Sequence, residues 1–233
     1  ESSALTILMG DAGTAKTFLS LACGLEQTVG EDPKYRSMLV VRPNVKFDET
    51  VGFLKGSEAQ KINPLIRPIM DNLDQLTAVN SEDYGTKQGM GGKKSKFATE
   101  EAEDKIVAPN SYAQYLFDSG KIEAQAMEYM RGRSIRDRYM IIDEAQNMTP
   151  LQAFGIISRA GVGTKIILTG DPNQVDNPLL DSKTNGLTYA ANAMKGSKVC
   201  TQITFEESEC ERSELAKEAI KRMKIKGKGR ESR

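Results

Sequence analysis

The sequence predicts an α/β fold in three layers, in which a mostly parallel sheet is covered by helices on both faces. Three observations predict it: apolar strand-like runs alternate with helical segments, several of these runs end in polar residues, and a glycine-containing turn joins the first run to a helix. Strands that alternate with helices pair in parallel, because each crossover helix packs back onto the sheet. Ligands of such sheets bind at the carboxyl ends of the strands.

The first predicted strand, Leu5–Met9, leads into a loop that ends in Lys-Thr, and a helix follows over residues 16–27. A strand, a glycine-containing loop and a helix in this order form the layout of a phosphate-binding P-loop. The backbone N–H groups of the loop and the N-terminus of the helix face an anion together. We therefore expect nucleotide phosphates to be bound by Gly10, Asp11, Ala12, Gly13, Thr14, Ala15, Lys16 and Thr17.

Three side chains at the end of this loop decide its chemistry. Lys16 is expected to reach the β- and γ-phosphates of ATP, and the Thr17 hydroxyl is expected to bind Mg²⁺. Ala15 departs from the usual pattern, which has glycine just before the lysine. We expect its methyl group to be tolerated only if the backbone φ is negative and room is left for the phosphate. A chance glycine-rich turn is the alternative interpretation of the loop.

A second apolar strand, Tyr139–Ile142, ends in two carboxylates. Asp143 is expected to hold Mg²⁺, directly or through water. Glu144 is expected to act as general base toward the attacking water. The alternative is an ordinary strand followed by an acidic helix N-terminus, where carboxylates suit the helix dipole.

A third apolar strand, Lys165–Thr169, is followed by the polar run Gly170–Gln174. Gln174 could sense the γ-phosphate or orient the attacking water, whereas Gly170–Pro172 could equally be a plain turn. The three strand ends together, in this order, favour one nucleotide site at the carboxyl edge of a parallel sheet.

The remaining elements are predicted from apolar periodicity and from capping residues. Thr149 is a suitable N-cap for a helix with Pro150 at its first position. Pro64 and Pro68 divide a helical stripe over residues 58–76 into two pieces. Further strands are expected at residues 37–41, 122–127 and 199–205, and further helices at residues 111–117, 150–159 and 212–223.

Two segments differ from this pattern. Residues 80–105 combine four glycines with clusters of both charges, which predicts a mobile insertion, either a substrate flap or a solvated loop without a role. The basic, glycine-containing tail from about residue 224 is typical of a solvated chain end. We treat residues 1–233 as one domain that carries both segments.

The composition excludes several classes of protein. The 32 basic and 32 acidic residues cancel, which argues against coating of nucleic acid by bulk charge. The absence of histidine excludes His metal sites and Ser-His triads. The three cysteines lack zinc-like spacing and are expected to be reduced thiols. No apolar run is long enough to cross a bilayer and no signal peptide is evident, so we expect a cytoplasmic protein without a membrane partner.

The run Asp143–Gln146, with Gly170–Gln174 downstream, resembles motifs of superfamily-one helicases. The wider sequence resembles the PhoH family, and more narrowly the PhoH half of proteins that carry an N-terminal PIN nuclease domain. No PIN domain is recognised in the sequence, so the nuclease activity of those proteins is not carried over to this chain. The resemblance covers most of the chain outside residues 77–110. The matching stretches are Val41–Pro43, Gly52–Gly56, Arg67–Asp71, Arg131–Ile135, Ile141–Asn147, Gly163–Lys165, Asn185–Leu187 and Glu211–Ala216.

The resemblance implies the RecA-like P-loop NTPase fold and an Mg²⁺-dependent ATPase. Helicases of this type ordinarily carry two such domains, and the chain has room for one. A homo-oligomeric ring, a hexamer, is therefore implied, as is coupling of hydrolysis to the binding or unwinding of RNA or of single-stranded nucleic acid. Two alternatives are a non-catalytic nucleotide-binding module and an RNA-binding assembly protein that ATP stabilises.

Several arginines are candidates for contacts with phosphate. Arg212 matches an arginine of the family pattern and is assigned to the γ-phosphate, in cis or from a neighbouring copy, with a helix-start surface residue as the alternative. Arg159 is a rival for that role. Arg42 is expected to contact the phosphate backbone of nucleic acid, because it ends the second predicted strand, where the related helicases make such contacts. Arg131 and Arg133 are expected to do the same as part of a local basic cluster at residues 131–138. Ion pairs between subunits of a ring are the alternative for the arginines of residues 131–138.

Overall fold

The computed structural model describes residues 3–43, 67–76, 112–130 and 135–209. Its centre is a six-stranded sheet in which every pair of neighbouring strands is parallel. The strand order is β3-β2-β4-β5-β1-β6. The strands are β1 Leu5–Gly10, β2 Ser37–Arg42, β3 Ile122–Ala126, β4 Arg138–Ile142, β5 Lys165–Gly170 and β6 Cys200–Phe205.

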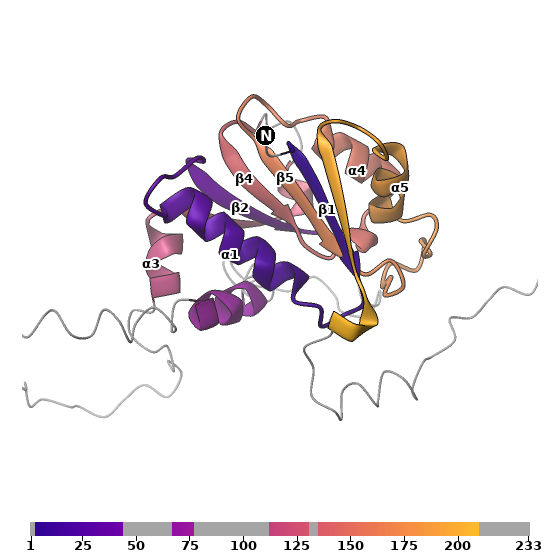
Figure 1. Cartoon of the computed structure of the whole chain (residues 1–233), viewed down its shortest axis with the longest axis horizontal. Coiled ribbons are helices and arrows are strands. Elements are labelled where there is room, and N and C mark those ends of the chain that lie inside the picture. Colours follow the sequence, from indigo (N-terminus) through magenta and orange to yellow (C-terminus); the bar gives the residue numbers. More distant parts are fainter. Residues whose placement is uncertain (1–2, 44–66, 77–111, 131–134, 210–233) are drawn as a thin grey trace, which may run out of the picture.

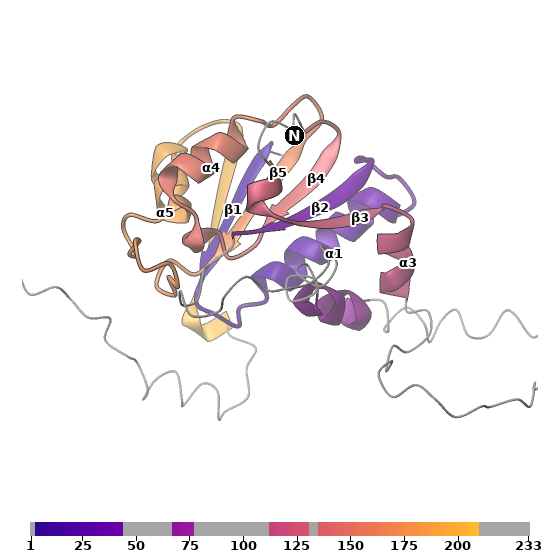
Figure 2. The ribbon, with the colours of Figure 1, turned by 180° about the vertical axis from the view of Figure 1, so that it is seen from behind.

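Helices cover both faces of the sheet, as Figures 1 and 2 show from opposite sides. One face carries α1 (Lys16–Val29), the helical residues 67–76 and α3 (Tyr112–Asp118). The other carries α4 (Pro150–Ile157) and α5 (Gly186–Ala193), together with the short 3₁₀ helices η1 (Met127–Met130) and η2 (Ala145–Asn147). A third 3₁₀ turn, η3 (Glu207–Glu209), follows β6. The predicted three-layer α/β fold is thereby confirmed.

Two hydrophobic clusters hold the layers together, one on each face. Side chains of a strand alternate between the two faces. On β4, Met140 and Ile142 therefore join the α4–α5 cluster, while Tyr139 and Ile141 join the α1 cluster. The whole of β2 except Arg42 is buried, as expected for a central strand of a parallel sheet.

Local sequence explains most of the element boundaries. Thr149 caps α4 through a capping box, in which its hydroxyl accepts from the Gln152 N–H and the Gln152 side chain accepts from the Thr149 N–H, and Pro150 stands in the first turn. The predicted cap is confirmed, although the helix ends at Ile157 rather than residue 159. The predicted strand 122–127 ends at Ala126, because η1 begins at Met127.

One helix was not predicted from the sequence. Helix α5 begins after Asn185, whose side chain accepts a hydrogen bond from the Thr188 N–H at 2.9 Å. The predicted helix 212–223, the insertion at 80–105, the basic tail and the first part of the helical stripe 58–76 lie outside the described residues. Over the ranges that the structure describes, no helix is both long and apolar enough for a membrane span.

Candidate nucleotide-binding site

The site lies at the carboxyl ends of three neighbouring strands. In the sheet, β5 lies between β1 and β4, so the loop after β1 faces the residues that follow the other two strands. A pocket of about 220 Å³ opens there. Of the predicted residues, it is lined by Ala12, Gly13, Ala15, Lys16, Thr17, Asp143, Glu144 and Gln174. The structure thus brings together residues that are up to 162 positions apart in the sequence, from Ala12 to Gln174.

The backbone at Ala15 does not meet the condition under which its methyl group was expected to be tolerated. Its φ is 54° and its ψ is 19°, in the left-handed region, whereas the condition was a negative φ. The reason is the turn from the loop into α1, in which Ala15 is the N-cap and its carbonyl accepts from the Leu19 N–H at 2.9 Å. This conformation costs an L-residue about 1–2 kcal/mol, whereas glycine adopts it freely.

Lys16 is held against the loop that precedes it. The Lys16 side chain is largely buried, and its Nζ donates to the carbonyls of Gly10 at 2.9 Å and Asp11 at 2.7 Å and to Thr14 Oγ1 at 3.1 Å. Burial lowers the pKa of the Lys16 ammonium, and the nearby carboxylates, Asp171 first among them, oppose that shift. The ammonium therefore lies inside the pocket with a fixed orientation.

Asp143 joins the P-loop to the sheet. The carboxylate is 1% exposed, and its Oδ1 accepts from the hydroxyls of Thr17 at 2.7 Å and Thr169 at 2.8 Å. Its Oδ2 accepts from Arg42, through Nε at 2.8 Å and also through Nη2. A threonine hydroxyl beside a carboxylate is the protein ligand set for Mg²⁺ in P-loop enzymes, with phosphate and water completing the shell. Thr17 and Asp143 therefore fit an Mg²⁺ site.

This ligand set is small, which suits magnesium. Mg²⁺ usually takes one or two carboxylates and keeps several waters. In the ranges that the structure describes, no group of three or more Cys, Asp or Glu side chains is placed to hold a metal. Thr17 and Asp143, with one hydroxyl and one carboxylate, are a ligand set of the size that Mg²⁺ takes from proteins.

Glu144 is oriented by a buried amide that the sequence analysis did not single out. Gln146, 1% exposed, donates from Nε2 to Glu144 Oε2 at 2.7 Å and to the Gln174 carbonyl at 3.0 Å. Its Oε1 accepts from the Asp171 N–H at 3.2 Å. The glutamine thus ties the end of β4 to the loop after β5. Its place as the fourth residue of the motif Asp143–Gln146 was the available sequence signal.

Asp171 is a second residue that sequence reasoning missed, because the run Gly170–Pro172 also fits a plain turn. The side chain is 5% exposed and bridges two loops: Oδ2 accepts from the Ala12 N–H at 3.1 Å and Oδ1 from the Asn173 N–H at 2.9 Å. Burial raises the pKa of the Asp171 carboxyl. An acid directly after a strand that neighbours the P-loop strand was the signal that could have identified it.

Gln174 lies at the rim of the same pocket. The residue is exposed, and its backbone N–H donates to the Asp171 carbonyl at 3.0 Å. Asn72, from the helical residues 67–76 of the α1 layer, also lines the pocket and was not predicted. The pocket therefore combines the three predicted strand ends with one helix of the α1 face.

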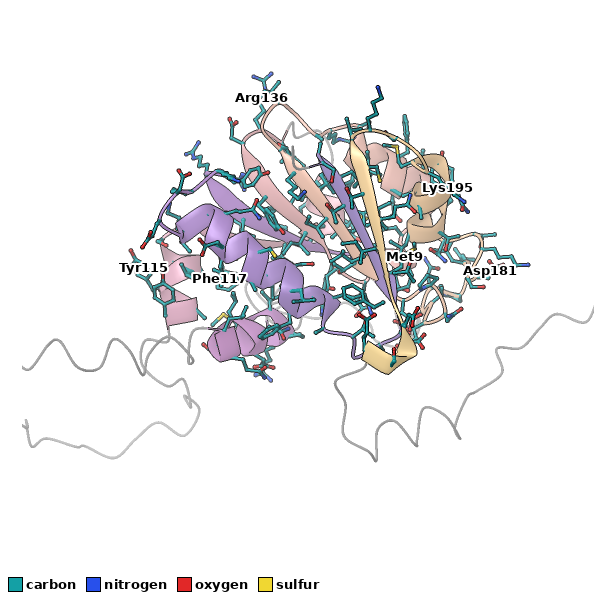
Figure 3. All side chains as sticks on the ribbon, in the orientation of Figure 1. Met9, Tyr115, Phe117, Arg136, Asp181 and Lys195 are labelled. Atoms are coloured by element: carbon teal, nitrogen blue, oxygen red, sulfur yellow. The ribbon has the colours of Figure 1, made fainter. Side chains whose placement is uncertain are left out.

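The predicted arginines lie in different places. Arg42 contacts Asp143 rather than open surface, and its contact with nucleic acid stays a prediction. Arg159 lines a separate pocket between α4 and η1, where it donates to the Gly155 carbonyl. Arg136 projects from the edge of the sheet where β4 begins, away from the P-loop (Figure 3). Arg138 pairs with Glu123 at 2.8 Å. Arg131, Arg133 and Arg212 lie outside the described residues.

The fold and this pocket define the class of protein. The sheet is all-parallel, a P-loop follows β1, and an Asp-Glu pair follows β4, which is separated from β1 by β5 alone. This arrangement is a RecA-like P-loop fold. The chain belongs to the PhoH family, a family of P-loop NTPases: the family model described as PhoH-like protein matches residues 1–224.

Curated relatives agree with this membership. The chain is 38% identical to Protein PhoH2 of Bacillus subtilis (strain 168) over 93% of this chain and 42% of that protein. It is 29% identical to a PhoH-like protein of the same organism over 91% of this chain and 56% of that protein. It is 28% identical to Protein PhoH of Escherichia coli (strain K12) over 94% of this chain and 53% of that protein. The chain spans about half the length of these relatives.

Proposed function

We propose that this chain binds ATP with Mg²⁺ and hydrolyses it at the pocket between the P-loop and β4. The observation that carries the proposal is the hydrogen bond of 2.7 Å between Thr17 Oγ1 and Asp143 Oδ1. It puts both expected metal ligands side by side, in a pocket that also contains the Lys16 ammonium and the Glu144 carboxylate. The groups that we assign to the phosphates, the metal and the attacking water then line one pocket.

Each side chain has a separate role in this proposal. Lys16 binds the β- and γ-phosphate oxygens, and Thr17 and Asp143 hold the metal. When bound, Mg²⁺ neutralises charge on the phosphates. Glu144 accepts a proton from the attacking water. Gln174 orients that water or contacts the γ-phosphate.

Hydrogen bonds within the pocket support these roles. The Gln146 amide holds one oxygen of Glu144 and leaves the other for water. Gln146 also bonds the Gln174 carbonyl, so the base and the γ-phosphate contact are positioned by one side chain. We further assign Arg212 to the developing γ-phosphate charge, on the family pattern.

We also propose that hydrolysis is coupled to RNA or single-stranded nucleic acid, in a homo-oligomeric ring in the cytoplasm, with a hexamer as the proposed form. Likeness to helicase motifs supports this, and it is an argument from fold. Arg42, Arg131 and Arg133 are the proposed contacts with the phosphate backbone. Because the net charge is zero, such contacts must come from a local patch.

A non-catalytic nucleotide-binding module is the second candidate, and the left-handed Ala15 favours it. Its methyl group belongs to a loop that lines the pocket and in which phosphate is bound through closely approaching backbone. In that case Ala15→Gly would increase turnover from near zero. An assembly protein that ATP stabilises is the third candidate. In that case ATP would change the mass of the assembly measured by light scattering, and RNA would not stimulate hydrolysis.

The decisive experiment compares phosphate release and binding of a fluorescent ATP analogue. Lys16→Ala is expected to abolish nucleotide binding, because the buried ammonium is lost. Glu144→Gln is expected to keep binding and lower turnover by about 100-fold or more, the usual contribution of a general base. Arg138→Gln breaks an ion pair that lies outside the pocket and serves as the matched control. Turnover that survives both Lys16→Ala and Glu144→Gln would refute the assignment.

A further inference from the structure

The pair formed by Arg42 and Asp143 joins a cation to the candidate metal ligand. The two residues are neighbours because β2 and β4 are paired, with Val41 opposite Ile142; Arg42 is the last residue of β2, and Asp143 directly follows the last residue of β4. The Asp143 N–H continues the ladder by donating to the Val41 carbonyl at 2.9 Å. Register therefore places the Arg42 guanidinium beside the Asp143 carboxylate at the ligand edge of the sheet.

All the acceptor positions of Asp143 are in use. An ionised carboxylate has about four lone-pair sites. Asp143 gives two to the hydroxyls of Thr17 and Thr169 and two to Nε and Nη2 of Arg42. A divalent cation at this carboxylate must therefore take a position that a hydrogen-bond donor holds.

The partners of Asp143 differ in how readily they can give way. Thr169 is fully buried within β5, and Thr17 is itself an expected metal ligand. The Arg42 side chain is 20% exposed, so it has a path toward solvent. It is also the only one of the three with a positive charge, and a metal ion bound through the same carboxylate would repel it. Arg42 is thus the partner that metal binding disturbs most.

We propose that Arg42 and the divalent metal compete for Asp143, so that Arg42 lowers the metal affinity of the site and metal binding releases the guanidinium. The inference rests on the proposed function in one respect, the assignment of Asp143 as a metal ligand. Coupling between two bound cations is reciprocal: if the guanidinium weakens metal binding, the metal weakens the ion pair by the same factor. Arg42 is in this view a positioning residue that acts through Asp143.

The test measures binding, not turnover. The affinity for ADP is measured by calorimetry in excess Mg²⁺ and in EDTA, and the ratio of the two dissociation constants gives the metal-dependent gain. In Arg42→Gln this ratio is expected to rise about tenfold or more. The reason is that repulsion between the guanidinium and the metal ion, which this variant removes, costs more free energy than a tenfold change in affinity represents. In Asp143→Asn the ratio is expected to fall to about one. Arg138→Gln, which removes an ion pair outside the pocket, should leave the ratio as it is.

A second variant separates charge from geometry. Arg42→Lys keeps the positive charge but lacks the planar fork that makes two bonds to a carboxylate. Its ratio is expected to lie between those of the wild type and Arg42→Gln. If Arg42→Gln does not fold, the lysine variant alone decides: a ratio above the wild-type value supports competition, and an equal or lower ratio overturns it.

Thermal unfolding gives an independent readout. In EDTA, Arg42→Gln leaves the buried Asp143 carboxylate without its cation, so its Tm is expected to fall. Addition of Mg²⁺ with ADP should then raise the Tm of Arg42→Gln by more than it raises that of the wild type.

The outcomes distinguish the two ideas. A ratio that collapses in Asp143→Asn but stays unchanged or falls in Arg42→Gln overturns the competition and leaves the metal site in place. A ratio retained in Asp143→Asn overturns both the metal site and the competition. If ADP fails to bind the wild type, the proposed function fails, and a titration of Mn²⁺ alone, followed by its paramagnetic resonance signal, decides the competition in the same variants.

Discussion

The left-handed alanine in the P-loop makes a prediction about stability that can be calculated from the backbone. Ala15 has φ 54°, a conformation that costs an L-residue about 1–2 kcal/mol. Ala15→Gly removes this cost. Glycine also has more freedom in the unfolded chain, which offsets about 0.5–1 kcal/mol of the gain. The net expectation is that Ala15→Gly raises the free energy of unfolding by about 0.5–1 kcal/mol.

The matched control is Ala12→Gly in the same loop. Within the described residues, positive φ at non-glycine positions occurs at Ala15, Asp137 and Glu144, and Ala12 is not among them. Ala12→Gly therefore adds freedom to the unfolded chain without relieving strain. It is expected to lower the free energy of unfolding by about 0.4–1 kcal/mol. The same substitution, alanine to glycine, is therefore expected to change the free energy of unfolding in opposite directions at the two positions.

Urea denaturation followed by circular dichroism measures both, since the chain has no tryptophan to report unfolding. The change in midpoint at constant m-value gives the difference in stability. A destabilised Ala15→Gly, with a loss equal to that of Ala12→Gly, would refute the left-handed assignment and the reasoning built on it.

Two further predictions concern packing and pH. A Cβ added at Gly24 of α1 would lie 2.9 Å from Cε1 of the Tyr139 ring, whereas a Cβ added at Gly155 of α4 would meet only the flexible end of an arginine side chain. The free energy of unfolding, measured in urea, should therefore be about 1–3 kcal/mol higher for Gly155→Ala than for Gly24→Ala. Equal free energies of unfolding for the two variants would contradict this packing. Burial lowers the pKa of the Lys16 ammonium below 10.5, so the folded protein loses this proton at a lower pH than the unfolded chain does. Between the lowered pKa and 10.5 the unfolded chain holds more protons, and the free energy of unfolding therefore rises with pH in that range. Lys16→Met should reduce that slope, while a matched change at the exposed Lys195 (Figure 3) should keep it; an unchanged slope in Lys16→Met would count against the burial of the ammonium.

Much of the site could be predicted because its chemistry lies at strand ends. A short apolar run followed by polar residues is recognisable in one sequence, and the carboxyl ends of parallel strands share one edge. That geometry alone brings Lys16, Asp143 and Gln174 to the same pocket. The cap of α4 was predictable for a similar reason, since Thr149 and Gln152 act on residues close to them in the chain.

Contacts between segments could not be predicted in the same way. Arg42 and Asp143 are 101 positions apart, and their contact depends on β2 lying beside β4, an order that the chain sequence does not state. The conformation of Ala15 could not be predicted for another reason. The sequence shows the cost of a left-handed alanine but not the gain from the turn that connects loop and helix, so the surrounding structure decides the backbone.

The hydrogen bonds of Gln146 and Asp171 bear on how the three segments act together. Asp171 holds the Ala12 N–H of the P-loop, Gln146 holds the Asp171 N–H and the Gln174 carbonyl, and the same amide holds Glu144. A shift of the P-loop on binding phosphate would therefore strain bonds that lead, through two buried side chains, to the expected general base. Each segment has its own recognisable chemistry, but the geometry of Glu144 depends on a loop that the P-loop contacts. The Gln146 side chain connects these segments because its amide donates and accepts hydrogen bonds at the same time.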